Sequence, residues 1–585
     1  MCEITAKTPW ADHLGIIPLH LEYYDGTMID MVEEVAAKNP NGIAFDFMGK
    51  STTYKEMMES IVNCAKALRT IGVRENDRIT IAMPNCPQAV YMFYAVNMVG
   101  AVANMIHPLS AEKEIEFYLN ESESVTAITL DQFYNKFENI RKNTKVVNII
   151  IASVKDALSK PIRAGYMFTE GRKIKRIPKD APVIRWNDFI KLSKCCFYNY
   201  RVSRKSEDPA VILYSGGTSG TTKGIILTNR NLNALGQQVI ASNPMFRPGD
   251  KMLAAMPLFH GFGLGVCIHS MLSQGGRCIL IPRFTAKSYA KQIVKYRCNF
   301  IAGVPTLFEA LLRLPTMEGA DLSCLKGVFS GGDTLSVEHK KKIDKFLFDH
   351  KAVIQVREGY GTTETVTACC LTPINMFKEG SIGLPFPDTY MKIVRPGTDE
   401  ELPYGEEGEI LIAGPTVMAG YMNNPEETAN TIRKHADGLE WVYTGDLGMM
   451  DSEGFVYFKG RAKRMIISSG YNIYPNQIEN ILDAHEYVRM SCVIGVPDAY
   501  RMQKPKAFVT LNPGVPANDS TKAILKDYCS KHVAKYAMPY DIEFREDMPM
   551  TKVGKVAYHV LEEEEHNKQE QGNNQAVYRG SKQGQ

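Results

Sequence analysis

The stretch from Leu213 to Thr228, LYSGGTSGTTKGIILT, limits the possible fold and function of this chain more than any other part of the sequence. The apolar run on each side is typical of a strand, so the small residues between the runs must form the connecting loop. Glycines let a ligand approach the backbone, and successive N–H groups can form a cradle for an anion. Hydroxyls and a lysine add donors suited to phosphate. The candidate phosphate-binding residues are Ser215, Gly216, Gly217, Thr218, Ser219, Gly220 and Lys223.

Two other interpretations of this loop compete with phosphate binding. A Gly/Ser loop alone is often a flexible surface turn. The phosphate loop of nucleotide hydrolases requires glycine directly before the lysine, and Thr222 stands there. No G-x-G-x-x-G string follows a predicted strand, so a dinucleotide-binding fold is disfavoured.

Apolar strands alternate with helices through the first third of the chain. Ala44–Phe47, Asp77–Met83, Val125–Leu130 and Val146–Ala152 are typical of buried strands, and Tyr54–Ile71 is typical of a helix. This alternation predicts parallel sheet in an α/β protein.

The run Ala89–Ile106 is the most membrane-like part of the chain. It is borderline in length for a span, and Asn97, Gly100 and Asn104 interrupt it. We therefore predict a helix buried inside a large domain, and no transmembrane segment.

Length and composition exclude several classes of protein. A chain of 585 residues should hold more than one domain, because single cores stop growing at about 250–300 residues. A net charge of +3 implies no general nucleic-acid partner. The 13 cysteines are scattered, and Met1 to Tyr24 lacks the apolar core of a signal peptide. From these two observations we expect the cysteines to be reduced thiols and the protein to be cytoplasmic.

Residues 153–205 interrupt the pattern of strands and helices and include the basic string EGRKIKRIPKD, Glu170–Asp180. A solvated surface insertion is the simpler interpretation. The alternative is attraction to anionic lipid, as weak peripheral membrane contact, or to the phosphates of a bulky cosubstrate.

Several later turns carry residues suited to a nucleotide. Tyr360 in REGYGTTET can stack on a base. Glu364 is an oxygen ligand of the kind that Mg²⁺ prefers, although a Gly-Thr-Glu turn is also an ordinary helix start. Asp446 in WVYTGDLG can accept hydrogen bonds from both ribose hydroxyls, or it can close an Asx-turn. His260 in PLFHGFGLG could equally be a core histidine.

Five strings, in chain order LYSGGTSGTTKG, GGDT, GYGTTE, YTGDLG and PMTKVGK, resemble the adenylate-forming superfamily of acyl-CoA synthetases, luciferases and the adenylation domains of peptide synthetases. The first is close to the family's YTSGTTGxPKG but departs at Gly216, Ser219 and Thr222. YTGDLG matches without change, GYGTTE matches GYGxTE, and Lys555 falls in the family's P-x-T-x-x-G-K pattern near the C-terminus.

The resemblance implies an α/β fold with a large N-terminal domain of layered α/β subdomains and a β-rich subdomain. A small, mobile α+β C-terminal domain follows. We predict the large domain at residues 1–460 and the small domain at 461–561. Residues 562–585 are polar and acidic and should form a disordered tail.

The resemblance also assigns roles. Lys555 would be the catalytic lysine, and His260 would flank the substrate carboxylate beside room left by Gly261, Gly263 and Gly265. Glu364 would hold magnesium and Lys463 would be the hinge. The implied adenine, phosphate and ribose contacts beyond the first loop are Gly332, Asp333, Tyr360, Gly361, Thr362, Thr363, Asp446 and Arg461. The implied path of the thiol passes Gly470 and Tyr471.

The implied reaction joins a carboxylic acid to AMP, using ATP and Mg²⁺, and then passes the acyl group to a thiol. No aspartate in LFHGFGLG could pair an amino group, and no carrier-protein string follows, so we expect a medium- or long-chain fatty acid and coenzyme A. An aromatic acid or a separate carrier protein remains an alternative. A nucleotide-binding protein without turnover is the alternative from another class.

Overall fold

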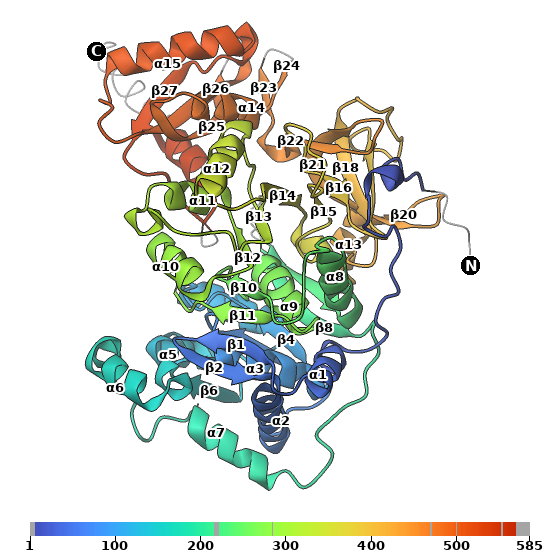
Figure 1. Cartoon of the computed structure of the whole chain (residues 1–585), viewed down its shortest axis with the longest axis vertical. Coiled ribbons are helices and arrows are strands. Elements are labelled where there is room, and N and C mark those ends of the chain that lie inside the picture. The colour runs from blue at the N-terminus through green and yellow to red at the C-terminus, as the bar shows by residue number, and fades with distance from the viewer. Residues whose placement is uncertain are drawn as a thin grey trace, which may run out of the picture.

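A computed structural model describes residues 6–215, 222–283, 285–468, 471–498, 500–551 and 554–568. It contains four sheets, of eight, nine, five and five strands. The two large sheets form the lower and central body in Figure 1, the third sheet lies at the upper right, and the fourth lies at the upper left beside the C-terminus.

The eight-stranded sheet carries the predicted phosphate loop. Its strands run in the order β19-β9-β8-β4-β3-β5-β6-β7, and β8 to β7 are parallel to one another. Their bounds are β3 (Arg78–Ala82), β4 (Val102–Met105), β5 (Thr126–Leu130), β6 (Asn148–Ala152), β7 (Ile184–Arg185), β8 (Pro209–Ser215), β9 (Lys223–Thr228) and β19 (Gly420–Tyr421).

The nine-stranded sheet has the order β16-β15-β14-β13-β12-β10-β11-β1-β2, and its central strands from β14 to β1 are parallel. Its strands are β1 (Ile43–Phe47), β2 (Lys50–Thr53), β10 (Lys251–Ala254), β11 (Arg277–Leu280), β12 (Phe300–Gly303), β13 (Gly327–Gly331), β14 (Val356–Tyr360), β15 (Cys370–Leu371) and β16 (Leu384–Pro385). The predicted parallel sheet is thus confirmed, and it is divided between two sheets.

Helices pack on both large sheets. They are α1 (Met28–Lys38), α2 (Tyr54–Thr70), α3 (Pro87–Met98), α4 (Glu112–Glu121), α5 (Tyr134–Ile140), α6 (Lys160–Phe168), α7 (Trp186–Leu192), α8 (Asn229–Ala241), α9 (Ser270–Leu272), α10 (Ala286–Tyr296), α11 (Pro305–Leu312) and α12 (Val337–Asp349). The start of α2 is set by a capping box in which Thr53 and Glu56 satisfy each other's backbone N–H groups. One continuous apolar core joins α3 to both sheets.

The third sheet is the predicted β-rich subdomain. It contains β17 (Tyr390–Val394), β18 (Gly408–Ala413), β20 (Ile432–Lys434), β21 (Glu440–Met450) and β22 (Val456–Arg461), with α13 (Pro425–Thr431) beside it. It has its own apolar core, which includes Trp10 from the N-terminal segment and Trp441 from β21.

The fourth sheet forms the small C-terminal domain. Its strands are β23 (Ile466–Ser468), β24 (Tyr471–Ile473), β25 (Val488–Asp498), β26 (Met502–Leu511) and β27 (Asp541–Arg545), and its helices are α14 (Pro475–Asp483) and α15 (Asp519–His532). This is the expected α+β composition, with a separate core. The boundary at residue 461 stays a prediction.

Three expectations need correction. The run Ala89–Ile106 is not one helix, because α3 ends at Met98 and the chain turns at Gly100, with φ of 73°, into β4. The predicted insertion 153–205 contains α6 and α7, and its strand β7 extends the eight-stranded sheet at β6. A helix over 558–568 passes the predicted start of the disordered tail at residue 562. Among the described residues, no helix has both the length and the apolarity to cross a membrane.

Candidate active site

The predicted base-binding turns lie at neighbouring strand ends. Strands β13 and β14 are parallel, and Gly331 pairs in register with Gly359. The chain therefore leaves both strands at the same edge of the sheet, with Gly332 after one and Tyr360 at the end of the other. Gly332 has φ of 84°, a conformation that favours glycine.

The ribose-binding candidates lie opposite each other on two antiparallel strands. Asp446 of β21 is in register with Arg461 of β22, and the Arg461 Nε atom lies 3.4 Å from Asp446 Oδ1. The Tyr360 hydroxyl donates to Asp446 Oδ2 at 2.8 Å. Burial raises the pKa of the Asp446 carboxyl, and the nearby Arg461 opposes that rise. We predicted Asp446 in a turn, and the structure corrects this: it is a residue of β21, fixed by strand pairing.

The first loop is only partly described. Residues 216–221, and with them the predicted Gly216, Gly217, Thr218, Ser219 and Gly220, lie outside the described residues. Ser215 and Lys223 pair across β8 and β9, so the loop begins and ends at one point. The Lys223 ammonium forms an ion pair with Glu427 and lies 4.9 Å from the centre of the Tyr421 ring.

Glu364 lies near that lysine. The Tyr421 hydroxyl donates to Glu364 Oε1 at 2.9 Å, so one tyrosine contacts both Lys223 and Glu364. Within the described part of the chain, this is the one hydrogen bond that the Glu364 carboxylate makes. A carboxylate with an available oxygen beside a phosphate loop fits a magnesium ion, which binds through few protein oxygens and phosphate.

The turn between Tyr360 and Glu364 is held tightly against the following segment. A Cβ on Gly361 would lie 2.3 Å from the Thr367 carbonyl oxygen, so the backbones approach closely here. Thr362 donates its N–H to Thr365 Oγ1 at 3.3 Å, and Thr363 begins a single 3₁₀ turn. The threonines are therefore positioned by the turn itself.

Lys555 reaches this site from the small domain. Its loop is closed by a Thr551 N–H bond to the Lys555 carbonyl at 2.7 Å and by a Lys555 N–H bond to Thr551 Oγ1 at 3.0 Å. The Thr306 hydroxyl at the start of α11 donates to the Gly554 carbonyl at 3.1 Å, which joins the loop to the large domain. A Cβ built on Gly332 would lie 4.0 Å from Lys555 Nζ. The sequence-distant lysine and the base-binding turn are thus brought together.

Burial and neighbouring charges tune this lysine. Burial lowers the pKa of the Lys555 ammonium, Asp333 and Asp446 raise it, and Arg461 lowers it. Asp333 is exposed, and its carboxylate accepts the Thr334 N–H at 2.9 Å. Asp333 therefore places a negative charge near Lys555.

His260 lies in the turn between β10 and the π-helix Phe262–His269. Its Nδ1 atom accepts the Phe262 N–H at 3.2 Å. Burial, with a smaller effect from Lys555, lowers the pKa of His260 to about 4. The imidazole is therefore neutral near pH 7 and can act as a hydrogen-bonding wall, not as a cation.

The hinge and thiol candidates lie on the small-domain side. Lys463 is exposed in the 3₁₀ turn Ala462–Arg464 between β22 and β23. Gly470 lies outside the described residues, and of Tyr471 only the backbone, at the start of β24, is described. The two domains also touch where Asn476 of α14 donates to Thr334 Oγ1 at 3.2 Å.

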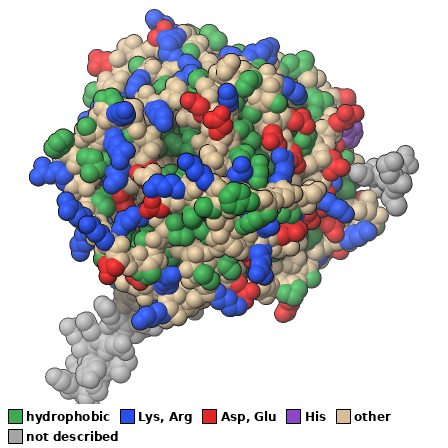
Figure 2. All heavy atoms as spheres, turned by 90° about the horizontal axis from the view of Figure 1, so that it is seen from below, with side chains coloured by type: hydrophobic (Ala, Val, Ile, Leu, Met, Phe, Trp, Pro, Cys, Tyr) green, Lys and Arg blue, Asp and Glu red, His purple; other side chains and the backbone are tan. Residues whose placement is uncertain are grey.

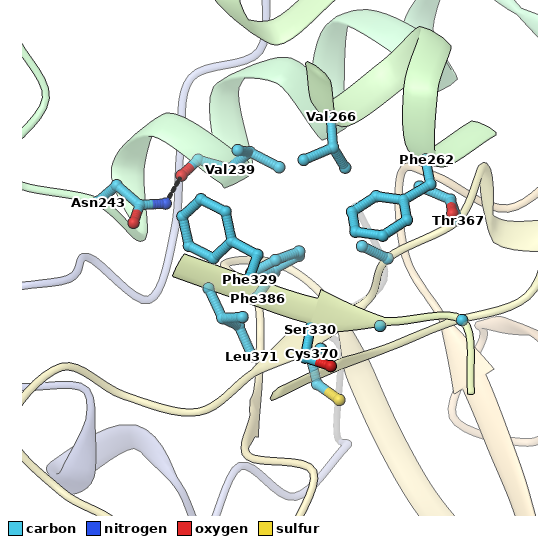
Figure 3. A pocket seen from close by; sticks show the side chains of 14 residues that line it. Val239, Asn243, Phe262, Val266, Phe329, Ser330, Thr367, Cys370, Leu371 and Phe386 are labelled. Carbon is cyan, nitrogen blue, oxygen red and sulfur yellow. Dashed lines mark hydrogen bonds between the residues drawn. The ribbon is translucent and has the colours of Figure 1, made fainter. Parts of the chain in front are cut away.

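An apolar cavity extends from the base-binding turn into the large domain (Figure 3). Its volume is about 40 Å³, and Gly332, next to Lys555, is at one end of its β13 wall. Figure 3 shows Phe262 and Val266 on one side and Phe329 and Phe386 on another. Strand residues are spaced by about 3.3 Å, so the wall from Gly332 to Phe329 is roughly 10 Å long.

A hydrogen-bonded polar pair, Asn243 and Arg357, lies at the end of this cavity next to α8. Asn243 lines the cavity and accepts a hydrogen bond from Arg357 Nη1 at 2.7 Å. Arg357 is buried and also donates to the carbonyls of Thr372 and Ser242. Burial lowers the pKa of Arg357 to about 9, so the group is charged near pH 7.

The glycines after His260 do not have the role that we expected. A Cβ on Gly261 would lie 1.7 Å from the Val366 carbonyl oxygen, and one on Gly263 would lie 2.1 Å from the Pro257 carbonyl oxygen. A Cβ on Gly265 would lie 2.6 Å from Leu235 Cδ2. These glycines allow close packing of the π-helix, and the cavity is bordered instead by Phe262 and Val266.

Four residues that support the candidate site were not predicted from the sequence. Tyr421 and Glu427 contact Lys223, Thr306 holds the Lys555 loop, and Glu358 accepts the Leu335 N–H behind the GGDT turn at 3.1 Å. Burial raises the pKa of Glu358 to about 8. Two features of the sequence could have pointed to some of these residues. They are the string MAGYMNNP, which contains Tyr421, and the position of Glu358 directly before the GYG string.

Comparisons with solved structures show the fold. The chain matches the anthranilate CoA ligase AuaEII in complex with anthranoyl-AMP, with a TM-score of 0.80 and 24% identity, over 92% of this chain and 96% of that one. It matches MatB from Rhodopseudomonas palustris with ATP bound at a TM-score of 0.78 and 24% identity, over 92% and 98% of the two chains. These likenesses show the fold, that of adenylate-forming enzymes with a large and a small domain, as predicted.

Sequence comparisons then identify the family. Residues 32–422 match the model of the AMP-binding enzyme family and residues 477–555 that of the AMP-binding enzyme C-terminal domain. The long-chain-fatty-acid–CoA ligase of Bacillus subtilis (strain 168) is 35% identical over 567 residues, which cover 96% of this chain and 98% of that protein. The chain belongs to the AMP-binding enzyme family. The resemblance to adenylate-forming enzymes is confirmed.

Proposed function

We propose that this protein is an ATP-dependent acid–thiol ligase that joins a fatty acid to coenzyme A through an acyl adenylate. The observation that carries the proposal is the approach of Lys555 to Gly332, beside Asp446 and Arg461 and at the mouth of an apolar cavity. A movable cation, a ribose-binding carboxylate and an apolar lining for the acyl group are what the two half-reactions require.

In the first half-reaction the acid carboxylate would attack the α-phosphorus of ATP and release pyrophosphate. Two anions must approach, so positive charge has to offset their repulsion. Lys555 would contact the carboxylate and the α-phosphate together, while Lys223, Ser215 and the threonines Thr362 and Thr363 would bind phosphate oxygens. Neutral His260 would border the carboxylate without adding charge.

The base and ribose would be bound by groups that the large domain already orients. Adenine would lie between the Gly332–Asp333 backbone and the Tyr360 ring. The ribose hydroxyls would donate to Asp446, with Arg461 beside it. Glu364 would bind Mg²⁺, which would neutralise phosphate charge when bound.

In the second half-reaction the thiol of coenzyme A would attack the acyl carbon, and AMP would leave. This step needs no cation at the α-phosphate. The small domain would rotate at Lys463, withdraw Lys555, and present the surface of Gly470 and Tyr471 to the thiol. One single polar bond joins the Lys555 loop to the large domain and another joins α14 to it, as suits a surface that must separate.

The acid would be a medium- or long-chain fatty acid. The cavity is lined mainly by apolar side chains, and its β13 wall runs roughly 10 Å from Gly332, which favours an apolar acyl group. Relatives over 30% identical carry the name long-chain-fatty-acid–CoA ligase. The buried pair Asn243 and Arg357 would set a polar limit at the α8 end of the cavity.

A panel of acids, scored by AMP formation with coenzyme A, tests this proposal. We expect saturated fatty acids to exceed benzoate and other aromatic acids in kcat/KM. A preference for aromatic acids would overturn the choice of acid. Activity only with a phosphopantetheine-bearing carrier protein would overturn the choice of thiol, and stabilisation by ATP without pyrophosphate release would mark a binding protein without turnover.

Filling the cavity should change chain length without abolishing catalysis. Val266→Phe adds bulk at the wall opposite Phe329, so we expect roughly tenfold lower kcat/KM for long acids and little change for short ones. Val294→Phe, at an exposed position outside the cavity, is the matched control. An unchanged chain-length profile would show that the acyl chain lies elsewhere.

We also propose a cytoplasmic location. All 12 cysteines in the described part of the chain are free, which suits a reducing compartment.

A further inference from the structure

Positive charge is concentrated in the segment that the function does not use. Residues 153–205 contain 14 Lys or Arg and 4 Asp or Glu, a net charge of +10, whereas the whole chain carries +3. The other residues are therefore net negative. So uneven a distribution points to a local role for this segment and not to general solubility.

Helix α6 in this segment has one face on the protein and one face in solvent. Ile162 and Tyr166, four residues apart, pack against the large core. Met167 and Phe168 point elsewhere and are 43% and 75% exposed. A phenylalanine so exposed gains nothing from the fold, so its apolar surface is available to something outside the chain.

The cations around these apolar side chains are mostly free of acidic partners. Lys173 pairs with Glu170. By contrast, six exposed cations make no ion pair with any residue that the structure describes: Lys160, Arg163, Arg172, Lys175, Arg176 and Lys179. Unpaired, exposed cations beside exposed apolar groups are the composition of a surface that meets anionic lipid.

The position of this surface separates it from the active site. In Figure 1, α6 and α7 lie at the lower end of the molecule, and the small domain with α14 and α15 lies at the upper end. Figure 2 looks onto the lower end and shows Lys and Arg side chains gathered on the left, the side on which α6 lies. The phosphates of a thiol cosubstrate at the domain junction would not reach it.

We propose that α6 and the basic stretch 172–179 form a docking surface for an anionic phospholipid bilayer. The exposed side chains of Met167 and Phe168 would enter the interface between headgroups and acyl chains. The unpaired cations would contact lipid phosphates. The enzyme would thus be a peripheral membrane protein. The docking itself requires neither ATP nor turnover.

Sedimentation of the full-length protein with vesicles tests the proposal. We expect binding to vesicles of phosphatidylcholine mixed with phosphatidylglycerol, weakening as salt rises, and little binding to phosphatidylcholine alone. Lys175→Gln with Arg176→Gln should weaken binding roughly thirtyfold, because each cation near such a surface contributes a factor of about five. Phe168→Ser should weaken it roughly tenfold.

The matched control is Lys434→Gln with Lys535→Gln, which removes the same charge from exposed positions outside this segment. It should bind vesicles like the wild type. Equal weakening by the control pair, or no loss in either test variant, would overturn the proposal. So would binding of RNA in preference to anionic vesicles. Because vesicle binding is read without substrate, failure here is distinct from failure of the ligase activity.

Discussion

Asp446 and Arg461 are held opposite each other by strand pairing within one sheet, whereas Lys555 belongs to a loop of the other domain. Asp446 is buried in β21, and Arg461 lies beside it at the end of β22, with its side chain partly exposed. The described polar contacts that join the small domain to the large one, such as Thr306 to Gly554 and Asn476 to Thr334, are single hydrogen bonds. From this difference we infer that the first part binds the nucleotide and that the second part moves. In the proposed function, the ribose site is built into the sheet and the Lys555 cation is brought to it.

The largest effect on the fixed part should come from Asp446→Ala. The change removes the acceptor for the ribose and leaves Tyr360 and Arg461 without their buried partner. We expect KM for ATP to rise roughly 100-fold, since each lost hydrogen bond to a charged group weakens binding severalfold or more. Isotope exchange between ATP and pyrophosphate at varied ATP measures this.

Glu409→Ala is a control near the same strands, because its carboxylate accepts the Gly445 N–H at 2.9 Å and does not contact Asp446. It should change KM for ATP far less. If both variants raised KM equally, the strand pairing and not the carboxylate would carry the effect.

A smaller effect should follow from restricting the movable part. Lys463→Pro fixes φ near −65° in a turn that already has helical geometry, so the arrangement with Lys555 in the site should persist. An arrangement that needs another φ would be strained. We expect thioester formation from supplied acyl adenylate to fall roughly tenfold, the factor for about 1.4 kcal/mol of strain. ATP–pyrophosphate exchange should stay near normal.

Lys463→Ala removes the same side chain without fixing φ, and it should leave both half-reactions near normal. Loss of exchange in the proline variant would mean that residue 463 is not where the domains turn.

The smallest effect should be a shift in pH dependence. Asp333 raises the pKa of the Lys555 ammonium, against the lowering by burial. Exchange should fall as pH rises through that pKa, because the neutral amine cannot offset anionic repulsion. Asp333→Asn keeps the hydrogen bond to the Thr334 N–H but removes the charge, so the alkaline decline should move to lower pH. Asp349→Asn, on α12 and paired with Lys345, is the control and should leave the profile unchanged.

Much of the fixed part could be predicted from the sequence, because its residues lie in short contiguous strings at strand ends. The site residues within GYGTTE, and those within YTGDLG, are adjacent in the chain, so each string locates several of them at once. Yet the sequence could not show that Asp446 is a strand residue facing Arg461, because register is a tertiary property. It also could not pair Lys223 with Glu427, 204 residues away in the chain.

The boundaries were harder to predict than the elements. Ala89–Ile106 is apolar throughout, and hydrophobicity alone does not distinguish a buried helix from a buried parallel strand. Gly100 divides the run, and its positive φ lets the chain turn from α3 into β4. The glycines after His260 were also misinterpreted. Their lack of side chains allows close packing of the π-helix and does not make room for the acyl cavity.

The most direct test of the account is Lys555→Ala, assayed separately in the two half-reactions. If the lysine serves only while it lies beside Gly332, ATP–pyrophosphate exchange should fall by roughly 100- to 1,000-fold. Thioester formation from supplied acyl adenylate and coenzyme A should stay close to the wild-type rate. Equal loss in both assays would contradict the division between a fixed nucleotide site and a cation that is brought to it.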